Sequence, residues 1–93
     1  MRVLHILVKH KYEAEDILRL LKQGRSFESL AQKLSICSSA SRGGDLGTFR
    51  KDSVDPDFLE ALMSLKAGET SGAVRTRFGY HIITKRDNDP SSP

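Results

Sequence analysis

Two strongly apolar, β-prone segments stand near opposite ends of this 93-residue chain, and they constrain its fold more than any other feature. The first is V-L-H-I-L-V at Val3–Val8, and the second is G-Y-H-I-I-T at Gly79–Thr84, so each carries one histidine among mainly aliphatic residues. Segments of this kind form strands within a sheet. If these two strands pair with each other, they form a sheet from the two ends of the protein, and the residues between them must fold over that sheet.

The strand pattern can be followed in more detail. In residues 3–8, alternation places Val3, His5 and Leu7 on one face and Leu4, Ile6 and Val8 on the other. Both faces are apolar apart from the histidine, which predicts a central strand covered on both sides. A last strand is expected at Tyr80–Lys85 after a short turn at Phe78-Gly79, and Thr70–Thr76 can form an edge strand that pairs with it antiparallel.

Two helices are expected after the first strand. Tyr12–Gln23 has an apolar stripe of period 3.6, and Gly24 supplies its C-cap. Ser26 is the expected N-cap of a second helix. The apolar residues of that second helix fall at i, i+3, i+4 and i+7, and they are Phe27, Leu30, Ala31 and Leu34.

A long segment rich in Gly and Ser, Ser35–Phe58, separates these helices from a third. Loops of this length in small domains are usually functional. Within it, Asp45–Arg50 has the alternation of a short strand. Asp55-Pro56-Asp57 then opens a helix with an N-cap, a proline at the first position and an acid in the first turn. The expected buried residues of this helix are Phe58, Leu59, Leu62 and Met63. The order of elements predicts an α+β fold.

Composition limits the class of protein. With 38% hydrophobic and 29% charged residues, the chain has the makeup of an ordinary globular domain. We expect one domain over residues 1–86 and a disordered tail over 87–93. One cysteine excludes an internal disulfide and favours a reducing compartment. No apolar run is long enough for a signal sequence or a membrane span. We therefore expect a cytoplasmic monomer, either whole or cut from a larger protein.

The histidines of the terminal segments, His5 and His81, are the first candidates for a functional site. If the first and last strands are neighbours, two imidazole rings meet in the middle of the sheet. One histidine in an apolar strand is usually structural, but two indicate a hydrogen-bonded pair because each buried ring needs partners for both nitrogens. A metal site is the weaker alternative, since only one cysteine accompanies them. We expect no metal and no cofactor.

Cys37 is a candidate nucleophile, because a single cysteine with histidines elsewhere in the chain can form a Cys–His pair. The alternative is a small buried side chain, the commoner state of a free cysteine. Four apolar residues on or beside loops could either pack against the core or line a ligand pocket, and they are Leu46, Val54, Phe58 and Phe78. The residues alone leave these alternatives open.

Several motifs, in their order and spacing, resemble those of the parvulin-type peptidyl-prolyl cis/trans isomerases. The motifs are H-I-L-V-K at His5–Lys9, F-E-S-L-A at Phe27–Ala31, C-S-S-A-S-R-G-G-D-L-G-T-F at Cys37–Phe49 and F-G-Y-H-I-I at Phe78–Ile83. The resemblance covers nearly the whole chain. It implies a four-stranded antiparallel sheet surrounded by helices, in agreement with the α+β order derived above.

The resemblance also implies catalytic roles. His5 and His81 correspond to the family's paired histidines on the central strands, and Cys37 corresponds to the position beside them that is Cys or Asp in relatives. Thr76 matches a hydroxyl that joins the histidine network. In this interpretation the thiol adjusts the polarity of the site and is not a nucleophile.

The substrate pocket can be carried over in the same way. Leu46, Val54 and Phe58 correspond to the pocket that receives the substrate proline ring, with Phe78 at its rim. Relatives commonly have methionine in the Val54 slot and a non-acidic residue at Asp55, so the pocket here is expected to be shallower and its rim more acidic. The phospho-specific branch inserts a basic loop after the first strand, for which Lys9–Tyr12 leaves no room, so a preference for phosphoserine is not expected.

The function implied is isomerisation of Xaa-Pro bonds in peptides and unfolded protein segments. One alternative is a non-catalytic, chaperone-like module that captures extended chains. Another is nucleic-acid binding, but the net charge of +3 is small and scattered. The basic residues that alternative would use are Arg42, Arg50, Lys51, Arg75 and Arg77. We expect neither nucleic-acid nor membrane partners.

Overall fold

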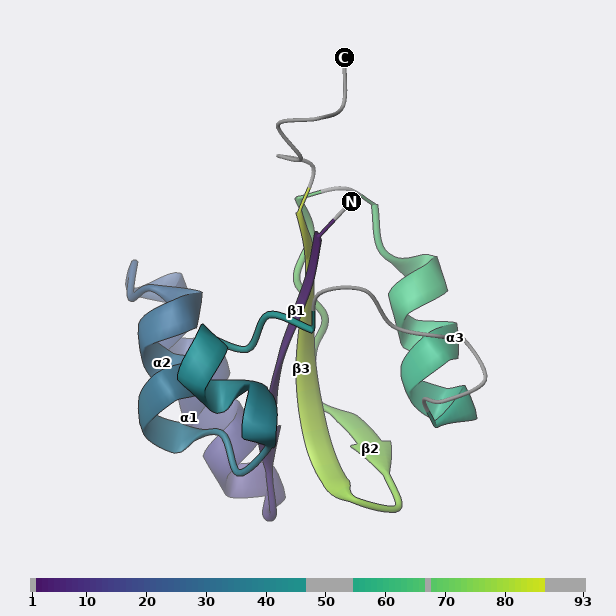
Figure 1. Cartoon of the computed structure of the whole chain (residues 1–93), viewed down its shortest axis with the longest axis horizontal. Helices are drawn as coiled ribbons and strands as arrows, with labels where there is room; N and C mark the ends of the chain where they lie inside the picture. Colours follow the sequence, from purple (N-terminus) through teal and green to yellow (C-terminus); the bar gives the residue numbers. More distant parts are fainter. Residues whose placement is uncertain (1, 47–54, 67, 87–93) are drawn as a thin grey trace.

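The computed structural model describes residues 2–46, 55–66 and 68–86, and these form a layered α+β fold. In chain order its elements are β1 (Arg2–Val8), α1 (Lys11–Lys22), α2 (Phe27–Leu34), the 3₁₀ helix η1 (Ser38–Arg42), α3 (Pro56–Ser64), β2 (Val74–Thr76) and β3 (Gly79–Arg86). The sheet is the middle layer, with α1 and α2 on one face and α3 on the other (Figure 1). The predicted α+β class is confirmed.

The sheet is antiparallel with strand order β1-β3-β2. The first and last strands pair along their length, from Arg2 opposite Arg86 to Val8 opposite Tyr80. The expected pairing of the two ends is therefore confirmed, and β2 is an edge strand as predicted. As predicted, β1 is covered by helices on both faces. Among the three named strands, however, β3 and not β1 holds the central place.

The other edge of β1 is partly covered by the segment that follows η1. Leu4 forms an isolated antiparallel bridge with Asp45, and the Leu46 N–H donates to the Val3 carbonyl at 3.0 Å. The family resemblance implied four strands, while the described residues form three. Of the expected strand at 45–50, only its first two residues lie within the described part of the chain, and there they do pair with β1.

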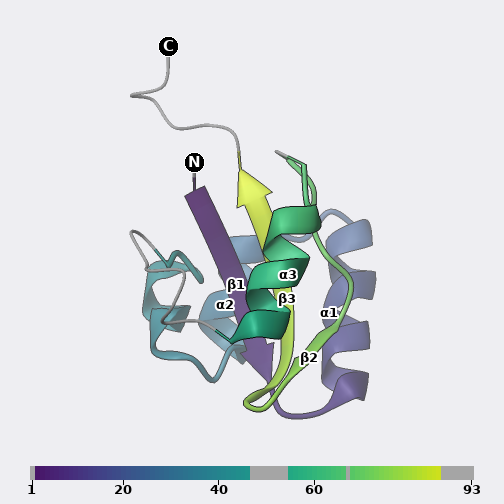
Figure 2. The same cartoon turned by 90° about the vertical axis from the view of Figure 1, so that its right-hand side faces the viewer.

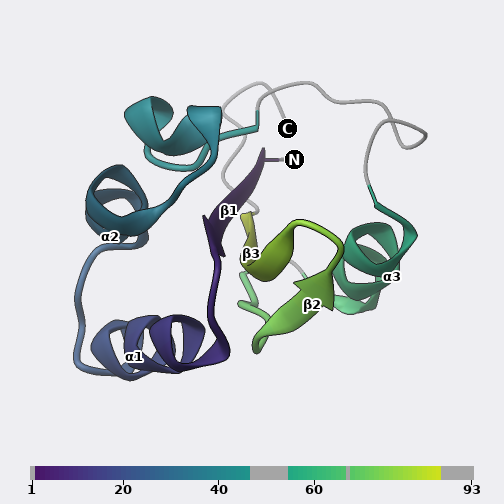
Figure 3. The ribbon, with the colours of Figure 1, turned by 90° about the horizontal axis from the view of Figure 1, so that it is seen from below.

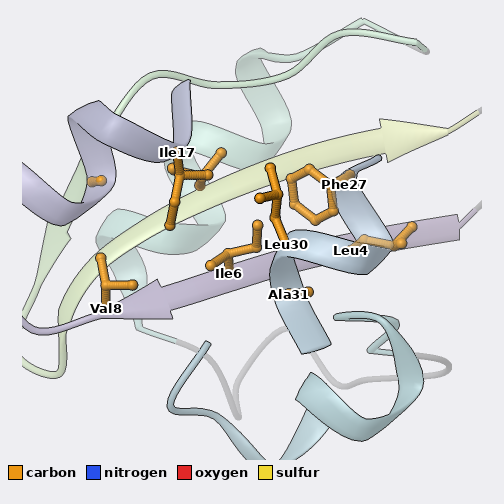
Figure 4. Close-up of a cluster of buried hydrophobic side chains, with 9 residues drawn as sticks. Leu4, Ile6, Val8, Ile17, Phe27, Leu30 and Ala31 are labelled. Atoms are coloured by element: carbon orange, nitrogen blue, oxygen red, sulfur yellow. The ribbon is translucent and has the colours of Figure 1, made fainter. Parts of the chain in front are cut away.

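Successive side chains of β1 point alternately to the two faces of the sheet, and each face carries one apolar cluster. Leu4, Ile6 and Val8 point toward α1 and α2, where they pack with Ile82 of β3. Figure 4 shows this larger cluster, completed by Ile17 of α1 and by Phe27, Leu30 and Ala31 of α2. Burial of each large aliphatic side chain contributes roughly 1.5–3 kcal/mol. This face of the sheet is therefore the main core.

The opposite face carries a smaller cluster beneath α3, which crosses in front of the sheet in Figure 2. Val3 and Ile83 pack there against Phe58 and Leu62. The expectation that Met63 is buried was wrong, since its side chain is 61% exposed. In a helix that touches the sheet along one narrow stripe, Met63 falls outside the contact line of Phe58 and Leu62.

The predicted helix boundaries hold where side chains cap them. Ser26 accepts a hydrogen bond from the Ser29 N–H at 3.2 Å, and Asp55 accepts one from the Asp57 N–H at 2.9 Å. Gly24 has a φ of +92°, the left-handed conformation expected just beyond the end of α1. Figure 3 shows the result from below, with α1 and α2 on one side of the strands and α3 on the other.

Candidate functional site

The two histidines meet on the α3 face of the sheet. In the β1–β3 register, His5 is opposite Ile83 and Leu7 is opposite His81, so the two imidazoles are diagonal neighbours on one face. Their Nδ1 atoms are 3.1 Å apart, and the rings stack at a centroid distance of 5.3 Å. Each residue is only 5% exposed. The expected hydrogen-bonded histidine pair is present.

Burial keeps this pair uncharged at neutral pH. Loss of solvation, reinforced by the neighbouring His81, lowers the pKa of His5 from 6.5 to about 4. Loss of solvation also lowers the pKa of His81, while the nearby Asp55 carboxylate acts in the opposite direction. Two neutral imidazoles can share one Nδ1 proton, because one ring donates and the other accepts.

Thr76 extends this pair on the far side of His81. Its Oγ1 lies 2.8 Å from His81 Nε2 and accepts from the Phe78 N–H at 3.2 Å. A hydroxyl oxygen has one proton and two lone pairs, so Oγ1 can either donate to Nε2 or accept a second hydrogen bond from it. Thr76, His81 and His5 therefore form a continuous hydrogen-bonded chain, and the two tautomers of His81 correspond to its two directions.

Phe58 forms a wall against both rings. It is buried on α3, and its ring stands at 82° to both His5 and His81, with centroids 5.6 and 5.2 Å away. Edge-to-face packing of this kind favours a fixed ring orientation. The Asp55 cap and Pro56 set the start of α3, so local sequence places Phe58 one half-turn into the helix. The phenyl ring and the histidine pair thus form one rigid surface.

The segment around Cys37 is attached to the edge of β1. The Leu7 N–H donates to Ser35 Oγ at 3.0 Å, and the Ile36 N–H donates to the Leu7 carbonyl at 2.8 Å. These bonds bring the partly exposed Cys37 beside the histidine face. Its thiol has no hydrogen-bond partner among the described residues, so the structure shows no Cys–His pair of the kind a nucleophile requires.

Gly44 lets the chain return close to His5. The His5 N–H donates to the Gly44 carbonyl at 2.9 Å, and Gly44 has a φ of +86°. A Cβ at this position would overlap the His5 carbonyl oxygen. Glycine is therefore required both for the backbone conformation and for the close approach. Packing against β1 thus explains the second glycine of the G-G pair, whereas a Cβ at the first, Gly43, would overlap the Glu28 side chain of α2.

These elements enclose a cavity of about 260 Å³. The residues that line it are His5, Leu7, Cys37, Asp55, Phe58, Phe78 and His81. The cavity is smaller than the roughly 300–1,000 Å³ that drug-sized ligands usually occupy. Two depressions of about 670 and 750 Å³ lie elsewhere, but charged and hydroxyl side chains make up most of their linings. The small cavity at the histidines is the candidate site, because it is apolar and lined by both histidines whose pKa is lowered.

The mouth of the cavity carries an aromatic ring and an ion pair. Phe78 is 57% exposed, and the Arg77 guanidinium lies 5.1 Å from the centre of its ring. Arg77 Nε is 3.6 Å from Asp55 Oδ2. This pair joins the β2–β3 turn to the start of α3. The ion pair thereby connects the two segments that carry Phe58 and Phe78, both of which line the cavity.

The structure brings together six of the eight residues singled out from the sequence. Five of them line the cavity, namely His5, Cys37, Phe58, Phe78 and His81. The sixth, Thr76, is hydrogen-bonded to His81. Leu46 is partly buried against the cluster beneath α3 and does not line the cavity. Val54 lies outside the described residues.

Two lining residues were not among those singled out as site residues. Leu7 lies on the same strand face as His5, and the alternation of β1 could have identified it. Asp55 was expected to cap the helix and, from the family resemblance, to make the pocket rim more acidic; the structure places it in the cavity wall itself. Within residues 2–46, 55–66 and 68–86, no group of three or more potential ligands gathers to hold a metal, and no helix could cross a membrane.

Comparisons with known proteins show which family has this architecture. Residues 5–87 match the model of the Rotamase family, described as the PPIC-type PPIASE domain. Foldase protein PrsA of Bacillus subtilis (strain 168) is 49% identical over 88 residues, which cover 94% of this chain and 30% of that protein. The crystal structure of PrsA from Bacillus subtilis matches with a TM-score of 0.88 at 47% identity, over 95% of this chain and 35% of that one.

A smaller relative matches along almost its full length. The solution structure of NmPin, the parvulin of Nitrosopumilus maritimus, gives a TM-score of 0.83 at 41% identity and covers 94% of this chain and 95% of that one. In contrast, the chain spans only about a third of the foldase relatives. The likeness therefore extends over the elements that build the cavity.

Proposed function

The chain belongs to the family of PPIC-type, or parvulin-type, peptidyl-prolyl cis/trans isomerase domains, and we propose that it isomerises Xaa-Pro bonds without covalent chemistry. The observation that carries this proposal is the small apolar cavity walled by Phe58 and by two buried, neutral histidines. A proline ring is an apolar group of a size suited to such a cavity. The substrates we propose are proline-containing peptides and unfolded protein segments.

The energetic demand is modest. Rotation about an Xaa-Pro bond has a barrier of about 18–20 kcal/mol, and no covalent bond to carbon needs to form or break. A rate acceleration of about 10⁴ requires only about 5–6 kcal/mol of preferential binding to the twisted state. Burial of the proline ring against Phe58 and one or two hydrogen bonds are enough to supply this.

The neutral histidine pair suits the electrostatics of the twisted amide. At the top of the barrier the amide has lost its resonance, so its carbonyl is less polar and its nitrogen accepts hydrogen bonds more readily. A charged imidazolium would favour the polar planar form, whereas His5 and His81 are held neutral by burial. We propose that the cavity holds the ring while Cys37 and the pair adjust polarity around the preceding carbonyl.

The connection between the first strand and first helix supports a preference for unmodified substrates. Only Lys9 and His10 lie between β1 and α1, so the basic loop of the phospho-specific branch has no counterpart here. We propose that phosphoserine before proline is not preferred. Exchange rates for matched Ser-Pro and phosphoSer-Pro peptides test this, and faster exchange of the phosphorylated peptide would contradict it.

Cys37→Asp tests the mechanism. In the proposal the thiol contributes polarity, so the carboxylate variant should retain kcat/KM within about tenfold of the parent, because general polar effects of one group are worth about 1 kcal/mol. A nucleophile could not be replaced in this way, and its loss would remove activity. NMR exchange spectroscopy on an Ala-Pro peptide measures the rate directly.

The same measurement separates the isomerase from the binding module. An isomerase broadens the cis and trans resonances of the peptide in proportion to the enzyme added. A peptide-binding module shifts those resonances without exchange between them. For the Cys37→Asp test described above, Cys37→Ala is the matched control, since it removes the thiol without introducing a charge. Binding without exchange in the parent protein would replace the isomerase proposal with the chaperone-like one.

A further inference from the structure

The ion pair at the mouth of the cavity has a role that helix capping does not explain. Asp55 uses Oδ1 to accept the Asp57 N–H at 2.9 Å, which caps α3. Its Oδ2 faces Arg77 Nε at 3.6 Å. An asparagine or serine could cap the helix equally well. The charge of Asp55 acts on His81, as described above, and its second oxygen is in contact with Arg77.

Both members of the pair belong to the rim of the cavity. Asp55 lines the cavity directly, and its side chain is 10% exposed. Arg77 is 75% exposed and held over the ring of Phe78, which also lines the cavity. Arg77 borders a second depression as well, between α3 and β2. The other charged residues of that depression, Asp57, Glu60 and Arg75, do not line the candidate site.

A substrate would bring its neighbouring side chains to this rim. With a proline ring in the cavity, the Cα atoms of the flanking residues are about 3.8 Å from the proline Cα. Their side chains must leave through the mouth, where Phe78 is exposed. A carboxylate or ammonium group on a flanking residue thus comes within interaction range of Asp55 and Arg77, well inside a Debye length of about 8–10 Å.

We propose that Asp55 and Arg77 together determine the substrate specificity at the mouth of the cavity. Each residue neutralises the charge of the other, so that proline is accepted whether its neighbouring residues are acidic, neutral or basic. This inference rests on the proposed isomerase function. Its consequence is that neither residue selects substrates while both are present. Removal of either one leaves the other uncompensated, and the two single variants become selective in opposite directions.

The test compares two peptides that differ only before proline, Ala-Glu-Pro-Phe and Ala-Lys-Pro-Phe. NMR exchange spectroscopy gives kcat/KM for each without a coupling protease. We expect Asp55→Asn, which keeps the cap, to raise the Glu/Lys ratio about threefold, the size of one rim interaction. Arg77→Gln should lower the ratio about threefold. The double variant should return to within about twofold of the parent, and high salt should remove both shifts.

Two controls separate local charge from other causes. Asp16 and Arg19 form an exposed pair on α1, with side chains 63% and 62% exposed, so Asp16→Asn and Arg19→Gln make the same charge changes away from the cavity. They should leave the ratio unchanged. Arg77→Lys keeps the charge without the planar guanidinium and should stay near the parent ratio. A structural role for Arg77 would make the Lys variant behave like the Gln variant.

The outcomes distinguish this inference from the proposed function. Exchange in the parent, with single variants that leave the ratio unchanged or shift it in the same direction, refutes the pair and leaves the isomerase proposal standing. No exchange on any peptide refutes the isomerase proposal. In that case the ratio of Kd values from chemical-shift titration tests the pair by the same criteria.

Discussion

The buried histidine pair predicts that acid weakens the fold. The pKa of His5 falls from 6.5 to about 4 on folding, so the folded state binds its proton less readily than the unfolded chain does. Between these two pH values the unfolded state holds more protons, and stability therefore decreases as the pH falls. The contribution of neutral His5 to the stability of the fold is fully present above about pH 6.5. It is lost progressively as the pH falls toward 4 and changes little below that.

The size of the effect follows from the pKa difference. One pKa unit corresponds to about 1.4 kcal/mol, so the change from 6.5 to about 4 gives a loss of about 3 kcal/mol. His81, whose pKa is also lowered, adds to this in the same direction. For a small domain with a total stability of about 5–15 kcal/mol, such a loss is readily measured.

Urea unfolding at a series of pH values from 7.5 to 4 tests this prediction, with His5→Gln as the key variant. Gln removes the titration but retains a polar group for His81, so the variant should be less stable at pH 7 and should have a flatter pH dependence. His10 is the exposed N-cap of α1, so His10→Asn, which keeps a capping side chain there, is the control and should lose stability on acidification as the parent does. A direct NMR titration that placed the pKa of His5 near 6.5 would refute the reasoning.

Two further substitutions test how the site is positioned. Thr76→Val keeps the shape of a side chain that is 7% exposed, but it leaves His81 Nε2 and the Phe78 N–H without their hydrogen-bond partner. The variant should therefore lower the free energy of unfolding by about 1–3 kcal/mol and reduce kcat/KM. Thr76→Ser, which keeps the hydroxyl, should restore both. Gly44→Ala should cost at least about 2 kcal/mol in thermal or urea unfolding, because it combines a positive φ with overlap on the His5 carbonyl; Gly24→Ala, where nothing lies within 4 Å, should cost only about 1–2 kcal/mol. Equal costs at the two glycines would show that the close approach to β1 contributes nothing.

The elements of the fold could be predicted where local interactions decide them. Ser26 and Asp55 cap their helices within three residues, and the alternation of Val3–Val8 assigns each side chain to a face of the sheet. The fourth strand could not be assessed in the same way, since most of Asp45–Arg50 lies outside the described residues. The burial of Met63 was predicted wrongly because apolar character alone does not tell how wide a stripe α3 presents to the sheet.

The sequence by itself determined the candidates for the site, since two histidines in apolar strands, one cysteine and the family motifs are all visible in the chain. Only the tertiary structure decided how they meet. The β1–β3 register sets the 3.1 Å contact between His5 and His81, and burial makes both rings neutral. The contact between Asp55 and Arg77 joins α3 to a distant turn. Short-range preferences act over a few residues, whereas register, burial and contacts across a cavity depend on how whole elements pack.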